Sequence, residues 1–213
     1  MAAIDATGVP VAALASVRLG TTLGINALLT RSGARTGLIT TRGFRDVLEI
    51  RRTHRQSLFD LDERFPDPLV PRDRRLEVRE RVDADGRVVE PLDEEGVREA
   101  WRRLRAGGVD ALAIVFLFSF ETPRHERRAR EIVEEEGGAA TVFISSDVLP
   151  AYREYERTST TVAAARIAGT VETALLDLER RLEGEGLPPG RLSIMTNAGG
   201  ALPAPAAGPL MAE

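Results

Sequence analysis

Polar residues gather in three short segments of this sequence, each placed where an apolar run ends. The first is Gly20-Thr21-Thr22, followed one helical turn later by Asn26. It separates an expected strand from an expected helix, so backbone N–H groups and two hydroxyls would face a phosphate or carboxylate at the strand's carboxyl end. The alternative is that Thr21 or Thr22 simply caps the helix. Spacing alone slightly favours the cap.

The second segment is "REYERTSTT", residues 153–161. Arg153 and Arg157 are four residues apart, as are Glu154 and Thr158, so each pair shares a face if a helix begins this early. One interpretation is an arginine that holds an anion beside a carboxylate at the mouth of a sheet. The other is an ion-paired helix start capped by a hydroxyl of the same segment. The residues alone favour the second, because surface ion pairs are common and contribute little.

The third segment, Thr40 to Arg52, ends a predicted strand and so opens onto its carboxyl edge. Arg45, Asp46, Glu49 and Arg51 would line a site there, or would form the solvated face of an amphipathic helix. The later "TNAGGA" is a glycine turn that resembles a phosphate loop only weakly.

The composition excludes several kinds of chemistry. All 29 cationic residues are arginine, which rules out a P-loop lysine, a Schiff-base lysine and a lysine general base. The absence of cysteine rules out a disulfide, a thiolate nucleophile and a zinc ribbon. His54 and His125 are too far apart for a HExxH pair, so we assign no metal to either.

Charge and hydropathy limit the partners that we expect. A net charge of -4 gives no basic field for nucleic acid. We find neither a signal peptide in residues 1–19 nor an apolar run of about 18 residues, so we expect no membrane span and a cytoplasmic protein.

The elements that must position these segments alternate along the chain, which predicts an α/β fold with a mainly parallel sheet, flanking helices and an edge β-hairpin. Asp85-Gly86 marks the hairpin turn, and the apolar run 111–118 predicts the central strand. Thr122 is expected to cap a helix that opens on Pro123. Strands are expected at 15–19, 35–41, 76–82, 88–89, 111–118, 141–145 and 192–196, and helices at 21–32, 43–50, 93–106, 122–136 and 156–183.

Several blocks, taken together, resemble the hydantoinase A / 5-oxoprolinase family, which includes acetone and acetophenone carboxylase subunits. The resemblance runs from about Val17 to Gly200, and it is specific because separate blocks agree in order and spacing. The blocks are "GTTLGINALLTRSGARTGLITTRGFRDVLEIRR", "PLVPRDRRLEVRERVDADGRVVEPLDEEGV", "REYERTSTTV" and "IMTNAGG".

The resemblance implies an actin-like (ribonuclease H-like) ATPase lobe, with ATP and Mg²⁺ as cofactors. It implies phosphorylation of an amide or ketone oxygen before ring opening or carboxylation, a cyclic-amide substrate and a hydantoinase B-like partner. No catalytic residue is assigned. The substrate- or nucleotide-binding candidates that it carries over are Gly20, Thr21, Thr22, Asn26, Arg45, Asp46, Arg153, Glu154, Glu156, Arg157, Thr158, Ser159 and Thr160.

The sequence also departs from the family pattern. No DxGGTxxD-like motif precedes Val17, Leu19 stands where the family usually has histidine, and Ala164 replaces a common asparagine. We therefore expect one domain over residues 1–198 that is truncated at its start, and a loose tail over 199–213 that leads toward a missing second ATPase lobe. Such a fragment would be inactive alone. The alternatives are a non-catalytic interaction module, a ketone carboxylase subunit, and a sugar-kinase-like lobe; the sequence does not choose among hydantoin, 5-oxoproline and ketone substrates.

Overall fold

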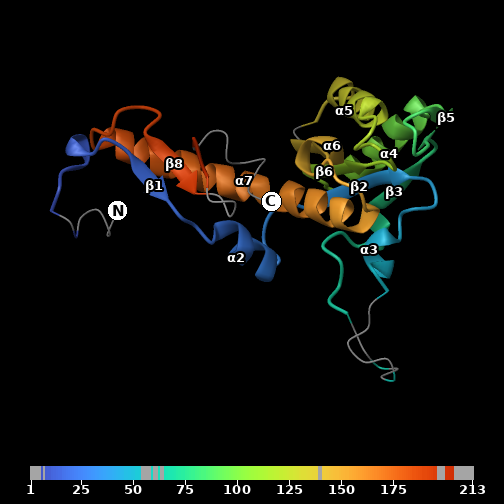
Figure 1. The fold of residues 1–213 in the computed structure, drawn as a ribbon, viewed down its shortest axis with the longest axis horizontal. Helices are drawn as coiled ribbons and strands as arrows, with labels where there is room; N and C mark the ends of the chain where they lie inside the picture. The colour runs from blue at the N-terminus through green and yellow to red at the C-terminus, as the bar shows by residue number, and fades with distance from the viewer. Residues whose placement is uncertain are drawn as a thin grey trace. The chain divides into compact units, whose positions relative to one another are not determined.

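The chain packs as two compact units in a computed structural model that describes residues 6, 8–53, 59, 62, 65–138, 141–195 and 200–203. One unit comprises residues 34–166, and the other combines 1–33 with 167–211. Helix α7 (Glu154–Gly184) contributes its first part to one unit and its second part to the other (Figure 1).

The unit 34–166 is built on a four-stranded parallel sheet in the order β3-β2-β6-β7. All five residues of β6 are buried, and β6 lies between two other strands, which confirms the central strand predicted from the apolar run. The strands are β2 (Thr36–Thr41), β3 (Arg75–Val78), β6 (Ala111–Val115) and β7 (Thr141–Ile144).

Two helices, α4 (Glu94–Ala106) and α5 (Arg124–Glu135), pack beside each other against the sheet (Figure 1). Val97, Trp101 and Leu104 of α4 are buried in the main core with Ile114 and Phe116, as the spacing of the apolar residues predicts, so α4 covers one face of the sheet. The shorter elements of this unit are α3 (Val47–Ile50), η2 (Arg72–Arg74) and α6 (Ser145–Val148).

The predicted hairpin exists, but it is not an edge of the main sheet. Strands β4 (Arg81–Val82) and β5 (Val88–Glu90) form a separate two-stranded antiparallel sheet, closed by a turn in which Asp83 accepts the N–H groups of Asp85 and Arg87. The first hairpin strand was expected at 76–82, but residues 75–78 form β3 of the main sheet. The chain leaves the sheet after β3 because the next carboxylate, Glu80, turns into the interior.

The second unit holds a three-stranded sheet in the order β1-β8-β9. Strand β1 (Val17–Leu19) is parallel to β8 (Leu192–Met195), and β9 (Ala201–Pro203) is antiparallel to β8. Apolar residues of α7, including Val171, Leu175 and Leu182, pack with β8 in a second core. Helix α2 (Leu23–Leu29) and η1 (Val11–Ala13) complete this unit.

Three sequence-based expectations are wrong at the level of elements. The expected strands at 15–19 and 35–41 do not lie in the same sheet, because β1 pairs with β8 while β2 pairs with β3 and β6. The tail is not uniformly loose, since β9 pairs with β8; residues 196–199 and 204–213 lie outside the described part. Thr122 does not cap α5, because Pro123 occupies the N-cap position and the Thr122 hydroxyl donates to the carbonyl of Gly86.

None of the helices in the described part of the chain is both long enough and apolar enough to cross a membrane. The extent of the predicted domain, 1–198, and its assignment as an actin-like lobe stay predictions.

Candidate functional site

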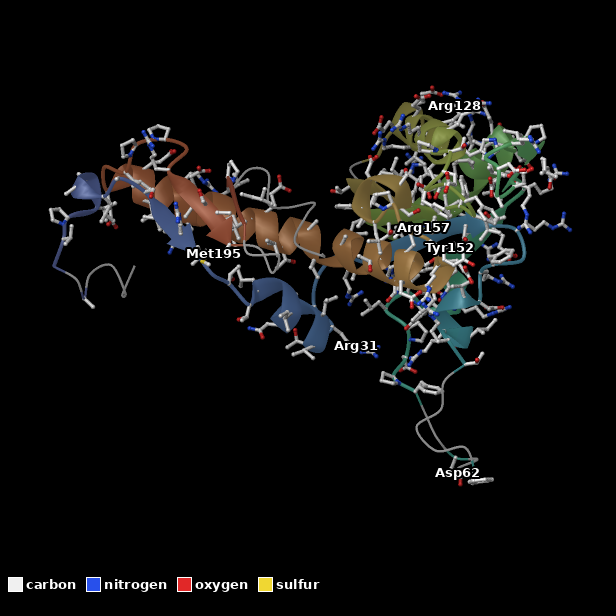
Figure 2. All side chains as sticks on the ribbon, in the orientation of Figure 1. Arg31, Asp62, Arg128, Tyr152, Arg157 and Met195 are labelled. Atoms are coloured by element: carbon white, nitrogen blue, oxygen red, sulfur yellow. The ribbon has the colours of Figure 1, made fainter. Side chains whose placement is uncertain are left out.

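A pocket of about 300 Å³ in the unit 34–166 brings together the end of α3 and the beginning of α7. Two segments that are a hundred residues apart in the sequence thus form one polar hollow. Its lining residues are Arg51, Arg52, Tyr152, Arg153, Glu154, Tyr155 and Glu156. Figure 2 labels Tyr152, which lines this pocket, and Arg157, which follows it on α7.

The two sides of the pocket are joined by an ion pair between Arg52 and Glu156. Arg52 Nε lies 2.6 Å from Glu156 Oε1, and Arg52 Nη2 lies 2.5 Å from the same oxygen. Burial opposes ionisation of Glu156, but hydrogen bonds, led by the one from Arg52, hold the pKa of its carboxyl below the usual value. The other oxygen, Oε2, is buried and has no hydrogen-bond partner in the described structure. A ligand that donates a hydrogen bond would satisfy it.

The backbone on both sides of the pocket adopts conformations that favour glycine, although none of the residues is glycine. Arg51 has φ 55°, Thr53 φ 57° and Arg153 φ 88°. Such conformations cost about 1–3 kcal/mol each and cluster at binding and active sites. Their position beside the polar hollow supports its assignment as a functional site.

Arg157 does not line the pocket, but its side chain holds the start of α7, which does line it. Its side chain is buried, Nη2 donates to the carbonyl of Phe116 at 2.6 Å, and Nη1 donates to the carbonyl of Ala151 at 3.4 Å. The guanidinium lies 5.2 Å from the ring centroid of Phe120. Burial lowers the pKa of Arg157. Arg157 therefore fixes the start of α7 to the carboxyl end of β6.

The hydroxyl residues that follow Arg157 lie within α7 and outside the pocket lining. Thr158 is buried and donates to the carbonyl of Glu154 at 2.6 Å, while Ser159 and Thr160 are half-buried. The alternative in which Thr158 caps the helix start is wrong, because α7 already begins at Glu154. Of the predicted residues in this segment, Arg153, Glu154 and Glu156 are the ones that meet in the pocket.

Arg45 and Asp46 lie outside this pocket. Asp46 accepts two hydrogen bonds from Arg72, at 2.9 and 3.0 Å, and these bonds hold the pKa of Asp46 below its usual value. The backbone N–H of Arg45 is 3.4 Å from Glu77 Oε1, and Arg45 lines a different hollow. The predicted third segment thus contributes Arg51 and Arg52 to the pocket at the start of α7, and Arg42 and Arg45 to the other hollow.

The Gly20-Thr21-Thr22 segment belongs to the other compact unit. Thr22 occupies the N-cap position of α2, but its side chain makes no capping hydrogen bond and instead accepts one from Asn26 Nδ2 at 3.3 Å. Thr21 Oγ1 accepts the N–H of Leu23 at 3.2 Å. The alternative in which Thr21 or Thr22 caps the helix is thus met only by Thr21, which accepts the N–H of the first helical residue from outside the N-cap position. The binding role of this segment stays a prediction.

A buried carboxylate at the carboxyl ends of the parallel strands was missed by the sequence analysis. Glu126 is fully buried and accepts hydrogen bonds from the N–H of Phe116 at 2.9 Å, Ser145 Oγ at 2.6 Å and the N–H of Ser146 at 2.8 Å. Burial raises the pKa of Glu126, and these hydrogen bonds offset part of that rise. Glu126 thereby links the ends of β6 and β7.

A second buried carboxylate, Glu80, closes the ends of β2 and β3. It accepts a hydrogen bond from the Thr41 hydroxyl through Oε1 and contacts His125 Nδ1 at 2.8 Å through Oε2. For Glu80 the available signal was its position just after β3, because the ends of parallel strands meet at one edge. Glu126 lies in the first turn of α5 and had no such signal. Arg52 and Tyr152 carried no such signal, since only the tertiary structure brings them to the pocket.

The donor set of the pocket suits an anionic or amide ligand better than a metal ion held by protein alone. Guanidinium groups are good donors to phosphate and carboxylate. In the part of the chain that the structure describes, no three acidic or histidine side chains are grouped to hold a metal ion. Mg²⁺ commonly uses one or two carboxylates together with phosphate oxygens, and Glu154 and Glu156 are the carboxylates of this pocket.

Comparison with known proteins identifies one family. Residues 2–137 match the hydantoinase/oxoprolinase N-terminal region. The acetophenone carboxylase gamma subunit of Aromatoleum aromaticum is 38% identical over 86% of this chain and 27% of its own length. The caprolactamase subunit alpha of Pseudomonas jessenii is 39% identical over 70% of this chain and 22% of its own length.

A solved structure agrees with these relatives. The crystal structure of the ATP-dependent caprolactamase from Pseudomonas jessenii superposes with a TM-score of 0.86 at 32% identity, over 95% of this chain and 30% of that one. The chain thus spans less than a third of the length of each of these proteins. The predicted resemblance is confirmed, and the chain belongs to the hydantoinase/oxoprolinase N-terminal region family.

Proposed function

We propose that this chain is part of a subunit of an ATP-dependent enzyme that opens cyclic amides, and that the pocket between Arg52 and Glu156 binds the amide. The relatives are named as caprolactamase and ketone carboxylase subunits, and the caprolactamase is described as ATP-dependent, which supports this class of activity. In the proposed reaction, ATP supplies a phosphoryl group to the amide oxygen before the ring opens.

The unpaired oxygen of Glu156 is the observation that carries the choice of substrate. An amide offers one carbonyl acceptor and one N–H donor. The pocket offers arginine donors and Glu156, whose Oε2 is buried with no hydrogen-bond partner among the described residues and would be reached by a ligand after a local side-chain movement. A ketone has no N–H and would leave Glu156 Oε2 unsatisfied, at a cost of about 1–3 kcal/mol. This argument favours a cyclic amide over the alternative ketone substrate.

The residues of the pocket would bind and orient the substrate. Arg153 would hold the amide oxygen or a negative charge that develops there, and Glu156 would hold the N–H. Arg52 would keep Glu156 ionised and in place, as its two short contacts to Oε1 indicate. ATP and Mg²⁺ belong to this proposal, and so does a hydantoinase B-like partner in a cytoplasmic enzyme; the naming of the relatives as subunits supports a partner.

Binding of small amides to the purified chain tests the proposal. Calorimetric titration should show binding of 5-oxoproline or caprolactam and weaker binding of cyclopentanone. Glu156→Gln should weaken amide binding about tenfold, because the glutamine NH2 replaces one of the two oxygens and places a donor against either Arg52 or the N–H of the ligand. The matched control is Asp177→Asn, which alters an exposed ion pair with Arg180 on the same helix. Stronger binding of the ketone than of the amides would contradict the choice of substrate.

The alternative, a non-catalytic interaction module of the same fold, predicts no heat with ATP or with any of these ligands. A separate measurement addresses activity. We expect no phosphate release from ATP by the chain alone, and steady ATP turnover would refute the proposal that it is only part of the enzyme.

A further inference from the structure

A second and larger hollow, of about 450 Å³, lies in the unit 34–166 and gathers four arginines from three segments. Arg42 and Arg45 follow β2, Arg79 follows β3, and Arg103 lies on α4. Its volume is within the range of small-molecule sites. The other lining residues are apolar, small or acidic: Leu76, Glu77, Val78, Asp93, Gly96, Glu99 and Ala100.

Two of the three carboxylates in this hollow are already satisfied by the fold. Asp93 accepts the N–H of Gly96 at 3.0 Å and two hydrogen bonds from Arg79, at 2.9 and 3.1 Å. Glu77 Oε1 accepts the N–H of Gly43 at 2.8 Å and that of Arg45 at 3.4 Å, so it stabilises the turn after β2. Asp93 is thus paired with Arg79, whereas Glu77 is held by backbone N–H groups and keeps its negative charge.

Three guanidinium groups are left without a partner of their own. The described contacts include no hydrogen bond or ion pair for the side chains of Arg42, Arg45 and Arg103, and Glu99, one turn before Arg103, makes no ion pair with it. Like charges gathered in one hollow repel one another, and a bound anion would offset that cost. The lining as a whole holds four arginines and three carboxylates, so it keeps a net positive charge that favours an anion.

We infer that Arg42, Arg45 and Arg103 of this hollow bind a small oxyanion, a phosphate or carboxylate compound. The site goes beyond the proposed amide pocket and shares no residue with it. Arginine favours such ligands because its planar donors match the oxygens of phosphate and carboxylate in pairs. Leu76, Val78 and Ala100 give the hollow an apolar portion that would exclude water from one side of the anion.

Titration of the full chain with sodium pyrophosphate and, separately, with citrate at constant ionic strength tests this site. We expect at least one of the two to bind, and Arg103→Gln or Arg45→Gln to weaken that binding about tenfold. Glu99→Gln should strengthen it about two- to fivefold, because a carboxylate that repels the anion is removed. Binding of pyrophosphate alone would identify a phosphate ligand, and binding of citrate alone a carboxylate ligand.

The matched control is Arg87→Gln, which removes one positive charge from the exposed hairpin turn. Equal weakening by Arg87→Gln and Arg103→Gln would mean general charge attraction and would overturn the site, as would the absence of binding by both anions. Thermal unfolding of each variant checks that the fold is retained. Glu156→Gln should leave anion binding unchanged, so the failure of this site and the failure of the amide pocket are distinguishable.

Discussion

Arg153 combines a positive φ with a position in the lining of the amide pocket. Its φ of 88° lies in the region that glycine adopts readily and other residues do not. An arginine at this φ lowers the stability of the fold, and its side chain lines the pocket instead of packing in the core. This is the pattern expected of a residue kept for binding.

Replacing Arg153 by glycine and by alanine distinguishes the effect of its backbone conformation from the effect of its side chain. Arg153→Gly should unfold at a higher denaturant concentration than Arg153→Ala, with a difference of about 1 kcal/mol or more in the free energy of unfolding, because glycine relieves the strained backbone. Both variants should lose amide binding. Chemical denaturation followed by circular dichroism measures the first effect, and an alanine variant as stable as the glycine variant would show that the backbone is not strained.

Helix α4 shows how a single element is started by one side chain. Asp93 caps its first turn through the N–H of Gly96 and at the same time holds Arg79. The hydrogen bond from Gly96, and then that from Arg79, keep the pKa of Asp93 below its usual value. The sequence predicts a helix over residues 93–106, which the structure confirms as α4, whereas the capping role of Asp93 is seen only in the structure.

The capping bond has a pH dependence of known sign. Because the pKa of Asp93 is lower in the folded state than in the unfolded state, its stabilisation is present above the unfolded pKa and is lost as the pH falls through the folded pKa. Asp93→Ala should therefore lower the free energy of unfolding by about 1 kcal/mol at pH 7 and by progressively less below about pH 4. Urea denaturation at several pH values tests this, and a deficit that grows toward acid would be inconsistent with the cap. Asp85→Ala, in the exposed hairpin turn, serves as the control.

At the scale of the whole molecule, the chain divides into two compact units with separate cores. The central sheet lies in the unit 34–166, with β2 and β6 paired on both sides and β3 and β7 paired on one. The buried carboxylates Glu80 and Glu126 join the ends of these strands. The interior of this sheet should consequently be the most resistant part of that unit.

Hydrogen exchange measures this resistance directly. Within residues 34–166, the amides of β2 and β6 should exchange last, because opening them requires loss of pairing on both sides and of the surrounding core. Mass spectrometry of exchanged peptides provides the rates. If the edge strands β3 and β7 were the slowest, the order of the sheet would have to be different.

Much of the fold follows from local patterns in the sequence. The apolar run at 111–115 gives a buried strand, and the spacing of Val97, Trp101 and Leu104 gives a helix with one buried face, because burial imposes these periods on neighbouring residues. Asp85-Gly86 gives the hairpin turn for the same local reason. The agreement of several blocks in order gives the family.

The tertiary structure alone decided which distant segments meet. Nothing local shows that β1 pairs with β8 rather than with the sheet of β2, or that Arg52 reaches Glu156 across a hundred residues. It also decided that Glu126 is buried and that Glu156 keeps one oxygen without a partner. Strand pairing and side-chain burial are set by packing between segments far apart in the chain, whereas periodicity and turn chemistry are set by residues that are neighbours in the sequence.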